Sequence, residues 1–209
     1  MFTCARIADV EYYLAEAEKA AEEGASPEKR DSAAYYLDNG AGEDTGVWWT
    51  VAPGALVPNG QPVDPNAFRR LARGVDPVSG KPLVQTNSTK RLAGYDLQFA
   101  APKSVSVLWA AGTPEQRAKM EGIHRRAVQA ALEGIREEGL IITRRGKGGA
   151  VKEAVANAAV AEFMHTTSRA GDPQLHSHAI LLNTCERADG TFGTLDNARI
   201  LQYLSLIHI

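Results

Sequence analysis

The feature that most restricts how this chain can fold is the stretch FMHTTSRAGDPQLHSHAILLN at residues 163–183, which contains three histidines. Its second half is typical of a strand, and side chains two apart on a strand share a face, so His176 and His178 point the same way. A turn around residues 170–171 then places His165, on the preceding strand, opposite the interval between them. The stretch therefore predicts an antiparallel hairpin with three imidazoles on one face of a sheet.

Three neutral imidazoles that leave a coordination position open are typical of a catalytic site for a divalent metal. We expect Mg²⁺ or Mn²⁺ to be the ion in use, and Zn²⁺ or Ni²⁺ could also bind. Two alternatives stay open at this point: each histidine could be an ordinary half-buried residue bonded to backbone, or the three could form a structural zinc site. The other two histidines, His124 and His208, have no such partners in the sequence, and we assign them no role.

The rest of the pattern predicts an α+β fold, with an antiparallel sheet that carries the three-histidine site on its face and helices packed on the sheet. Further strands are expected at residues 1–7, 47–51, 92–100, 140–143, 158–166, 174–185 and 191–195. Helices are expected at residues 9–24, at 32–38, after the capping residue Asp64 with Phe68 and Leu71 on one face, and at 114–138. Pro102 is expected to end the strand before it, and residues 144–149 to form a basic, glycine-rich hairpin tip.

The composition is that of an ordinary globular domain, with 209 residues, 44% hydrophobic and 23% charged. No signal peptide or membrane span is predicted, and with two distant cysteines a cytoplasmic protein is expected. The net charge of −2 hides a segregation, because residues 47–152 carry 16 basic and 8 acidic side chains between two acidic ends. A basic middle of this kind is compatible with a nucleic-acid partner.

Four of the six tyrosines form two doublets, Tyr12-Tyr13 and Tyr35-Tyr36. A tyrosine beside a metal-bound phosphate can attack phosphorus and form a covalent phosphotyrosine, which keeps the bond energy for rejoining the strand. The phenol has an ordinary pKa near 10, so it needs help from a base or a metal. Asp96 is the best-placed carboxylate if its strand lies beside the histidine strands.

The histidine stretch, the stretch GYDLQFAAPKSVSVLW at residues 94–109 and the tyrosine doublets resemble the relaxase domain of MobF-class conjugative relaxases, the TrwC/TraI type of HUH endonuclease. The resemblance runs from the N-terminus to about Tyr203. It implies a palm-like HUH fold and a metal-dependent enzyme that nicks single-stranded DNA at the origin of transfer. The enzyme would stay attached to the 5′ phosphate through a tyrosine and so initiate plasmid transfer.

By position, the resemblance implies the roles of individual residues. The metal ligands would be His165, His176 and His178, and Asp96 would orient a ligand or help to deprotonate the nucleophile. Tyr12 would nick, and Tyr35 would serve a second strand transfer, although the spacing of 23 residues between them exceeds that of the best-known members. Candidate DNA contacts are Arg169, Lys103, Arg144, Arg145 and Lys147, together with Arg69, Arg70, Arg125, Arg126 and, for base stacking, Trp48 and Trp49.

We expect residues 1–203 to be a relaxase domain that is incomplete at its C-terminus. Residues 204–209, LSLIHI, match the translation of a common transposon-end sequencing adapter, and we expect them to be a scar. In the full-length protein, a helicase region and the relaxosome and type IV secretion coupling machinery are the expected partners, with no membrane contact. No P-loop occurs, so ATP hydrolysis is not expected.

Two other functions remain open from the sequence. A rolling-circle replication initiator or a transposase could use the same HUH site for the same chemistry. A catalytically inactive, truncated DNA-binding module would keep the fold without the reaction. Metal-dependent formation of a covalent DNA adduct separates the enzymes from the inactive module.

Overall fold

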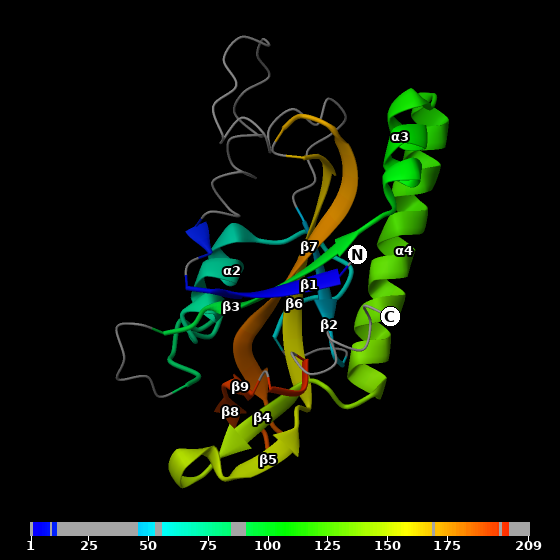
Figure 1. The fold of residues 1–209 in the computed structure, drawn as a ribbon. Coiled ribbons are helices and arrows are strands. Elements are labelled where there is room, and N and C mark those ends of the chain that lie inside the picture. Colours follow the sequence, from blue (N-terminus) through cyan, green and yellow to red (C-terminus); the bar gives the residue numbers. More distant parts are fainter. Residues whose placement is uncertain are drawn as a thin grey trace.

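The computed structural model describes residues 2–8, 10–11, 46–52, 56–84, 91–168, 170–196 and 198–200. Their centre is an antiparallel sheet with the strand order β1-β3-β7-β6-β2 and with β8 paired to β7 (Figure 1). These strands are β1 (Phe2–Ile7), β2 (Val47–Thr50), β3 (Gly94–Ala100), β6 (Asn157–Thr167), β7 (Pro173–Glu186) and β8 (Phe192–Gly193). The longest strand, β7, therefore lies between β3 and β6 and is hydrogen-bonded on both edges.

A smaller antiparallel sheet lies at one end of the central sheet, with the order β5-β4-β9 (Figure 1). It consists of β4 (Ile142–Arg145), β5 (Val151–Ala154) and β9 (Leu195–Asp196), and the short 3₁₀ turn η2 (Lys147–Gly149) joins β4 to β5. Gly146, Gly148 and Gly149 in this turn have positive φ, a backbone conformation that glycine adopts without steric cost.

Both faces of the central sheet are buried, which explains why β7 is apolar along most of its length. On one face, Phe68 and Leu71 of α2 (Pro65–Ala72) pack with Trp48, Phe163 and other buried residues. On the other face, α4 (Pro114–Glu137) packs Val128, Leu132 and Ile135 against the sheet. Figure 1 shows α2 on one side of the sheet and α4 on the other.

Both of these helices begin at the residues that the sequence indicates. Asp64 accepts a hydrogen bond from the Ala67 backbone N–H at 2.6 Å and Pro65 follows it, which is a regular helix N-terminus. Thr113 and Gln116 form a reciprocal capping box at the start of α4. The predicted helix with Phe68 and Leu71 on its buried face is confirmed, since neither side chain is exposed.

One helix was not predicted. Residues after Pro102 form α3 (Lys103–Ala111), which lies beside α4 (Figure 1). Ser106 is the only buried residue of this helix. A buried apolar face is therefore not needed, and the sequence KSVSVLWAA shows no pattern of apolar and polar residues at helical spacing. A helix that contacts β7 through one small buried side chain leaves no periodic signal.

The other expectations differ from the structure mainly at element ends. Arg144 and Arg145 belong to β4 and not to the hairpin tip, which begins at Gly146. The strand expected at residues 191–195 is two short strands, β8 and β9, which belong to different sheets. The helices expected at residues 9–24 and 32–38 lie almost wholly outside the described residues, as do residues 204–209.

Candidate metal centre and active site

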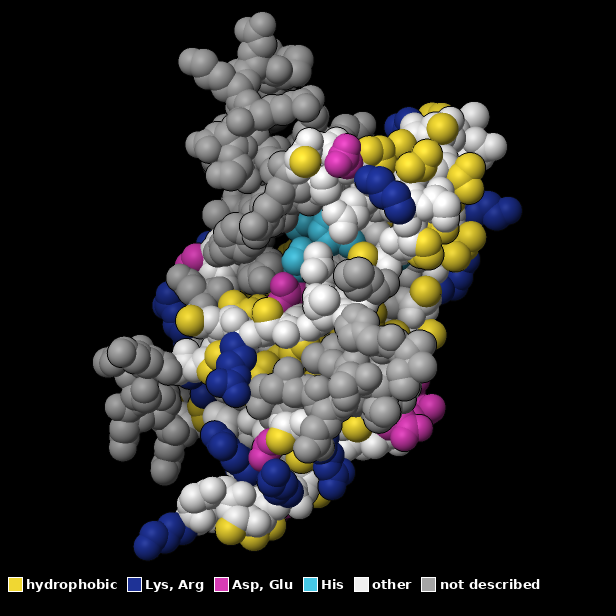
Figure 2. Space-filling view, viewed as in Figure 1, with side chains coloured by type: hydrophobic (Ala, Val, Ile, Leu, Met, Phe, Trp, Pro, Cys, Tyr) yellow, Lys and Arg dark blue, Asp and Glu magenta, His cyan; other side chains and the backbone are white. Residues whose placement is uncertain are grey.

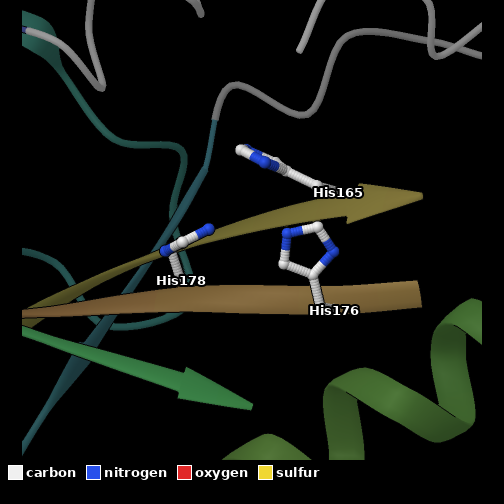
Figure 3. Close-up of side chains that lie close together, drawn as sticks. All are labelled: His165, His176 and His178. Atoms are coloured by element: carbon white, nitrogen blue, oxygen red, sulfur yellow. The ribbon is translucent and has the colours of Figure 1, made fainter. Parts of the chain in front are cut away.

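The three histidines converge on one face of the β6–β7 hairpin (Figure 3). His165 of β6 is the direct partner of His176 in β7, and His178 follows on the same face. The ring centroids are 5.3 Å apart for His165 and His176 and 5.2 Å apart for the other two pairs. One nitrogen from each ring lies within 4.8 Å of the other two. The predicted convergence is therefore confirmed, although His165 lies opposite His176 itself and not opposite the interval between His176 and His178.

Hydrogen bonds orient the imidazoles of His176 and His178. The Nδ1 of His178 is 2.8 Å from Oδ2 of Asp96, and the Nδ1 of His176 is 2.9 Å from the backbone carbonyl oxygen of Gln174. A carbonyl or carboxylate oxygen accepts, so in both rings Nδ1 carries the proton and Nε2 keeps its lone pair. This arrangement of a carboxylate or carbonyl behind each ring is the usual support for a histidine that binds a metal.

The local environment keeps His165 and His176 neutral. Burial, together with the neighbouring His178 and His176, lowers the pKa of His165 to about 3. Burial is also the main cause that lowers the pKa of His176. Neutral imidazoles bind a cation without first losing protons, so the donor set fits a divalent metal. Figure 2 shows histidine side chains at the surface, in a hollow of the face that it draws.

Asp96 lies where the sequence placed it. It occupies β3, the neighbour of β7, and its register partner is Ile180, two residues beyond His178 on the same face. Only 9% of Asp96 is exposed, and its hydrogen bond to His178 crosses the two strands. The carboxylate is thus positioned to orient a ligand histidine, one of the two roles that the resemblance implies.

Lys103 is a predicted DNA contact that lies close to the histidine hairpin. It is the first residue of α3, is exposed, and donates from Nζ to the backbone carbonyl of Pro173 at 3.1 Å. Pro173 begins β7, three residues before His176. The ammonium group therefore lies at the turn end of the β6–β7 hairpin, near the histidines.

The basic residues of β4 and η2 lie at the other end of the sheet. They adjoin the start of β6 at Asn157, whereas His165 lies eight residues further along the strand, or about 26 Å at 3.3 Å per residue. Arg145 is ion-paired with Asp189 at 2.8 Å and with Glu153 at 3.1 Å, while Arg144 and Lys147 are exposed. Figure 2 shows Lys and Arg side chains gathered at this end. These residues are not brought to the histidines.

One expectation is wrong in part and another lies outside the described residues. Trp48 cannot stack on bases in this structure, because it is 1% exposed and its ring packs edge-on against Phe68. Trp49 is half-buried and packs against the core on the α4 side. Tyr12, Tyr35 and Arg169 lie outside the described residues.

The sequence also missed a partner of His124. Its Nε2 lies 3.1 Å from the hydroxyl of Ser177, on the face of β7 opposite the three histidines. From the sequence alone we assign His124 no role, and the structure gives it this hydrogen-bond partner. The available signal was the strand alternation itself, which turns Ser177 away from its two histidine neighbours, but nothing in the sequence indicates which helix residue meets it.

An antiparallel sheet that presents three histidines from one hairpin, with a carboxylate behind one of them, could hold a divalent metal and agrees with the relaxase class that the sequence resembles. The sequence model of the family described as TrwC relaxase matches residues 7–207. The chain therefore belongs to the TrwC relaxase family. No helix in the described part of the chain is long and apolar enough to cross a membrane.

Individual relatives agree with this assignment. The multifunctional conjugation protein TraI of Escherichia coli is 36% identical over 141 residues, which are 66% of this chain and 8% of TraI. Two solved structures of the conjugative relaxase TrwC with DNA are also similar. The metal-bound complex with OriT DNA has a TM-score of 0.72 and 29% identity, and the match covers 99% of this chain and 65% of TrwC. The complex with a 27-mer that comprises the recognition hairpin and cleavage site has a TM-score of 0.67 and 28% identity, with 97% and 62% covered.

Proposed function

We propose that this chain is the catalytic part of a conjugative relaxase domain. The domain nicks single-stranded DNA at an origin of transfer and remains joined to the 5′ phosphate of the cut strand. The observation that carries the proposal is the convergence of His165, His176 and His178 with Asp96 behind His178. Membership of the TrwC relaxase family and the similarity to TrwC in complex with OriT DNA support it.

The three imidazoles would hold one divalent cation, Mg²⁺ or Mn²⁺ in use, through Nε2 of His176 and His178 and one ring nitrogen of His165. A cation bound there would polarise the scissile phosphate and offset negative charge in the transition state. Asp96 keeps the His178 ring turned so that Nε2 faces the site.

The nucleophile in this proposal is the phenol oxygen of Tyr12. It forms a bond to phosphorus as the bond from phosphorus to the 3′ oxygen breaks, and the released 3′ oxygen takes up a proton. The product is a 5′ phosphotyrosine and a free 3′ hydroxyl, and attack by another 3′ hydroxyl reverses the step. Tyr35 would serve a second strand transfer.

The DNA would pass the turn end of the β6–β7 hairpin, where Lys103 and Arg169 would contact phosphates. Arg144, Arg145 and Lys147 would contact DNA further from the cut, with Arg145 contributing least because two acidic groups already bind it. The chain spans 8% of the TraI relatives, so a helicase region and the coupling machinery of the secretion system would belong to the whole protein. We propose that it acts in the cytoplasm.

Incubation of the protein with labelled single-stranded oligonucleotides that tile the transfer origin of its own plasmid tests this function. We expect a covalent adduct that forms with Mn²⁺ or Mg²⁺ and is lost with a chelator. Tyr12→Phe should abolish the adduct, whereas Tyr35→Phe should leave the first cleavage intact. Tyr13→Phe and Tyr36→Phe are matched controls within each doublet and should retain the first cleavage.

Three outcomes would contradict the proposal. If no oligonucleotide forms a metal-dependent adduct, the chain is an inactive DNA-binding module. If Tyr35→Phe removes the adduct and Tyr12→Phe does not, the roles of the tyrosines are reversed. If chelation unfolds the protein, as circular dichroism would show, the histidines form a structural zinc site.

A further inference from the structure

Behind the three histidines, on the opposite face of β7, lies a chain of three buried polar side chains. Ser177 donates from its hydroxyl to Oε1 of Glu162 at 3.1 Å, and Nε2 of His124 is 3.1 Å from the same hydroxyl. The exposed fractions are 0% for Ser177, 2% for Glu162 and 8% for His124. Three elements, α4, β7 and β6, are thus joined through one hydroxyl group.

The direction of these hydrogen bonds follows from the groups themselves. A serine hydroxyl has one proton, which Ser177 gives to Glu162, so the His124 ring must donate its Nε2 proton to the serine oxygen. Burial lowers the pKa of His124 to about 4, so the ring is neutral at pH 7 and can carry its single proton on Nε2. When every donor of such a buried hydrogen-bond network has one acceptor, the network holds its side chains in one arrangement.

The position of Ser177 along the strand is what connects this chain to the metal site. Ser177 lies between His176 and His178, and successive side chains of a strand point to opposite faces. Any rotation of the strand about its axis at Ser177 would therefore swing both imidazoles on the other face. A binding site needs its ligands held within about 0.5 Å of the productive arrangement.

We propose that His124, Ser177 and Glu162 are positioning residues of the metal centre. From behind the sheet, they fix the rotation of β7 and so set where the nitrogens of His176 and His178 meet that of His165. The inference rests on the proposed function only in that the three histidines hold a divalent metal. It does not depend on which DNA is cut or on which tyrosine attacks.

Titration with Co²⁺ tests the proposal, because its visible absorption reports both affinity and ligand geometry. Ser177→Ala removes the shared hydroxyl and should weaken Co²⁺ binding at least tenfold, with an altered absorption spectrum, since loss of a group that orients metal ligands typically costs 10-fold to 100-fold in affinity. If Ser177→Ala does not fold, His124→Phe removes the other hydrogen-bond donor of the network, and the same loss of Co²⁺ affinity is expected.

Thr184→Val is the matched control for a structural effect. Thr184 is a fully buried hydroxyl of the same strand that accepts from Arg91 and donates to the Leu71 carbonyl, away from the histidines. Its loss should lower the melting temperature without changing the affinity for Co²⁺ or the spectrum. Glu162→Gln keeps an oxygen that can accept from Ser177, so it should bind Co²⁺ within about threefold of the unaltered protein.

Several results would overturn the inference. Co²⁺ binding by Ser177→Ala with unchanged affinity and spectrum would do so, as would an equal loss in Thr184→Val. A loss in Glu162→Gln as large as in Ser177→Ala would show that the carboxylate charge, and not the hydrogen bond, matters. If the unaltered protein binds no Co²⁺, both this inference and the metal centre fail. If it binds Co²⁺ and responds as expected but forms no DNA adduct, only the proposed function fails.

Discussion

Asp96 shows how one carboxylate can set the tautomer and the orientation of a neighbouring histidine. It has an exposed fraction of 9%, and its oxygen is 2.8 Å from Nδ1 of His178. Because this bond keeps the proton on Nδ1, Nε2 is left with a lone pair on the side that faces the other two histidines. The effect of Asp96 is thus exerted on the tautomer and orientation of a ligand.

We expect Asp96→Asn to weaken binding of Mn²⁺ or Co²⁺ by 10-fold to 100-fold, because the neutral amide holds the His178 tautomer less firmly. Isothermal titration calorimetry on the purified protein measures this. Asp64→Asn is a suitable control, since the same chemical change at the cap of α2 keeps a good N-cap residue and should leave metal affinity unchanged. Equal affinities for Asp96→Asn and the unaltered protein would show that the hydrogen bond has no such role.

Residues that depend on local chain geometry could be predicted from the sequence, and those that depend on distant contacts could not. The convergence of His165, His176 and His178 follows from strand alternation and one turn, all within a short stretch. The partner of His124 is 53 residues away in the sequence and depends on how α4 packs across β7. Trp48 was expected on the surface because its strand carries no signal that β2 would be covered by α2.

Among the elements, α3 contributes more to the site than its length indicates. Its buried residue, Ser106, accepts a hydrogen bond from the Leu175 backbone N–H at 3.0 Å, one residue before His176. The backbone N–H of Ala101, just before the helix, donates to the Leu175 carbonyl at 2.9 Å. The segment that follows β3 therefore binds both the N–H and the carbonyl group of Leu175, near the start of β7.

Ser106→Ala should destabilise the protein by about 1–3 kcal/mol, because it leaves the buried N–H of Leu175 without its acceptor. Urea denaturation followed by circular dichroism measures the free energy of unfolding. Ser104→Ala, in the same helix but exposed, should change that free energy by less than about 0.5 kcal/mol. Similar values for the two variants would show that water replaces the Ser106 hydroxyl without cost.

The absence of α3 from the sequence-based expectations has a physical cause. Helix prediction relies on apolar residues at helical spacing, and α4 shows them at Val128, Leu132 and Ile135. In α3 the apolar residues Val107 and Leu108 are exposed, and the buried one is a serine. The β6–β7 hairpin was predictable because its turn is local, whereas the break between β8 and β9 depends on which sheet each one joins.

At the scale of the whole molecule, the buried neutral histidines make stability depend on pH. Burial, then His176 and Arg125, lower the pKa of His124 to about 4, below its ordinary value of 6.5. Between these two pH values His124 is protonated in the unfolded protein but not in the folded protein, so acid favours unfolding. The stabilising effect of a neutral His124 is complete above pH 6.5 and declines as the pH falls toward 4.

His124→Gln removes this proton from the balance. We expect the free energy of unfolding to fall less steeply between pH 6.5 and 4 in the variant, by up to about 1.4 kcal/mol per pH unit, which corresponds to one proton. Chemical denaturation at a series of pH values measures the slope. Parallel slopes in both proteins would mean that His124 is protonated in the folded state.

The closeness of the histidines in the sequence has a consequence for how such a protein can diverge. All three lie between residues 165 and 178, on one hairpin, and a single carboxylate from the next strand completes the group. Closing so short a loop costs little chain entropy, so the ligands meet through local contacts. The basic loops and helices elsewhere can therefore accumulate changes, and acquire a new target sequence, while the reactive centre is inherited intact.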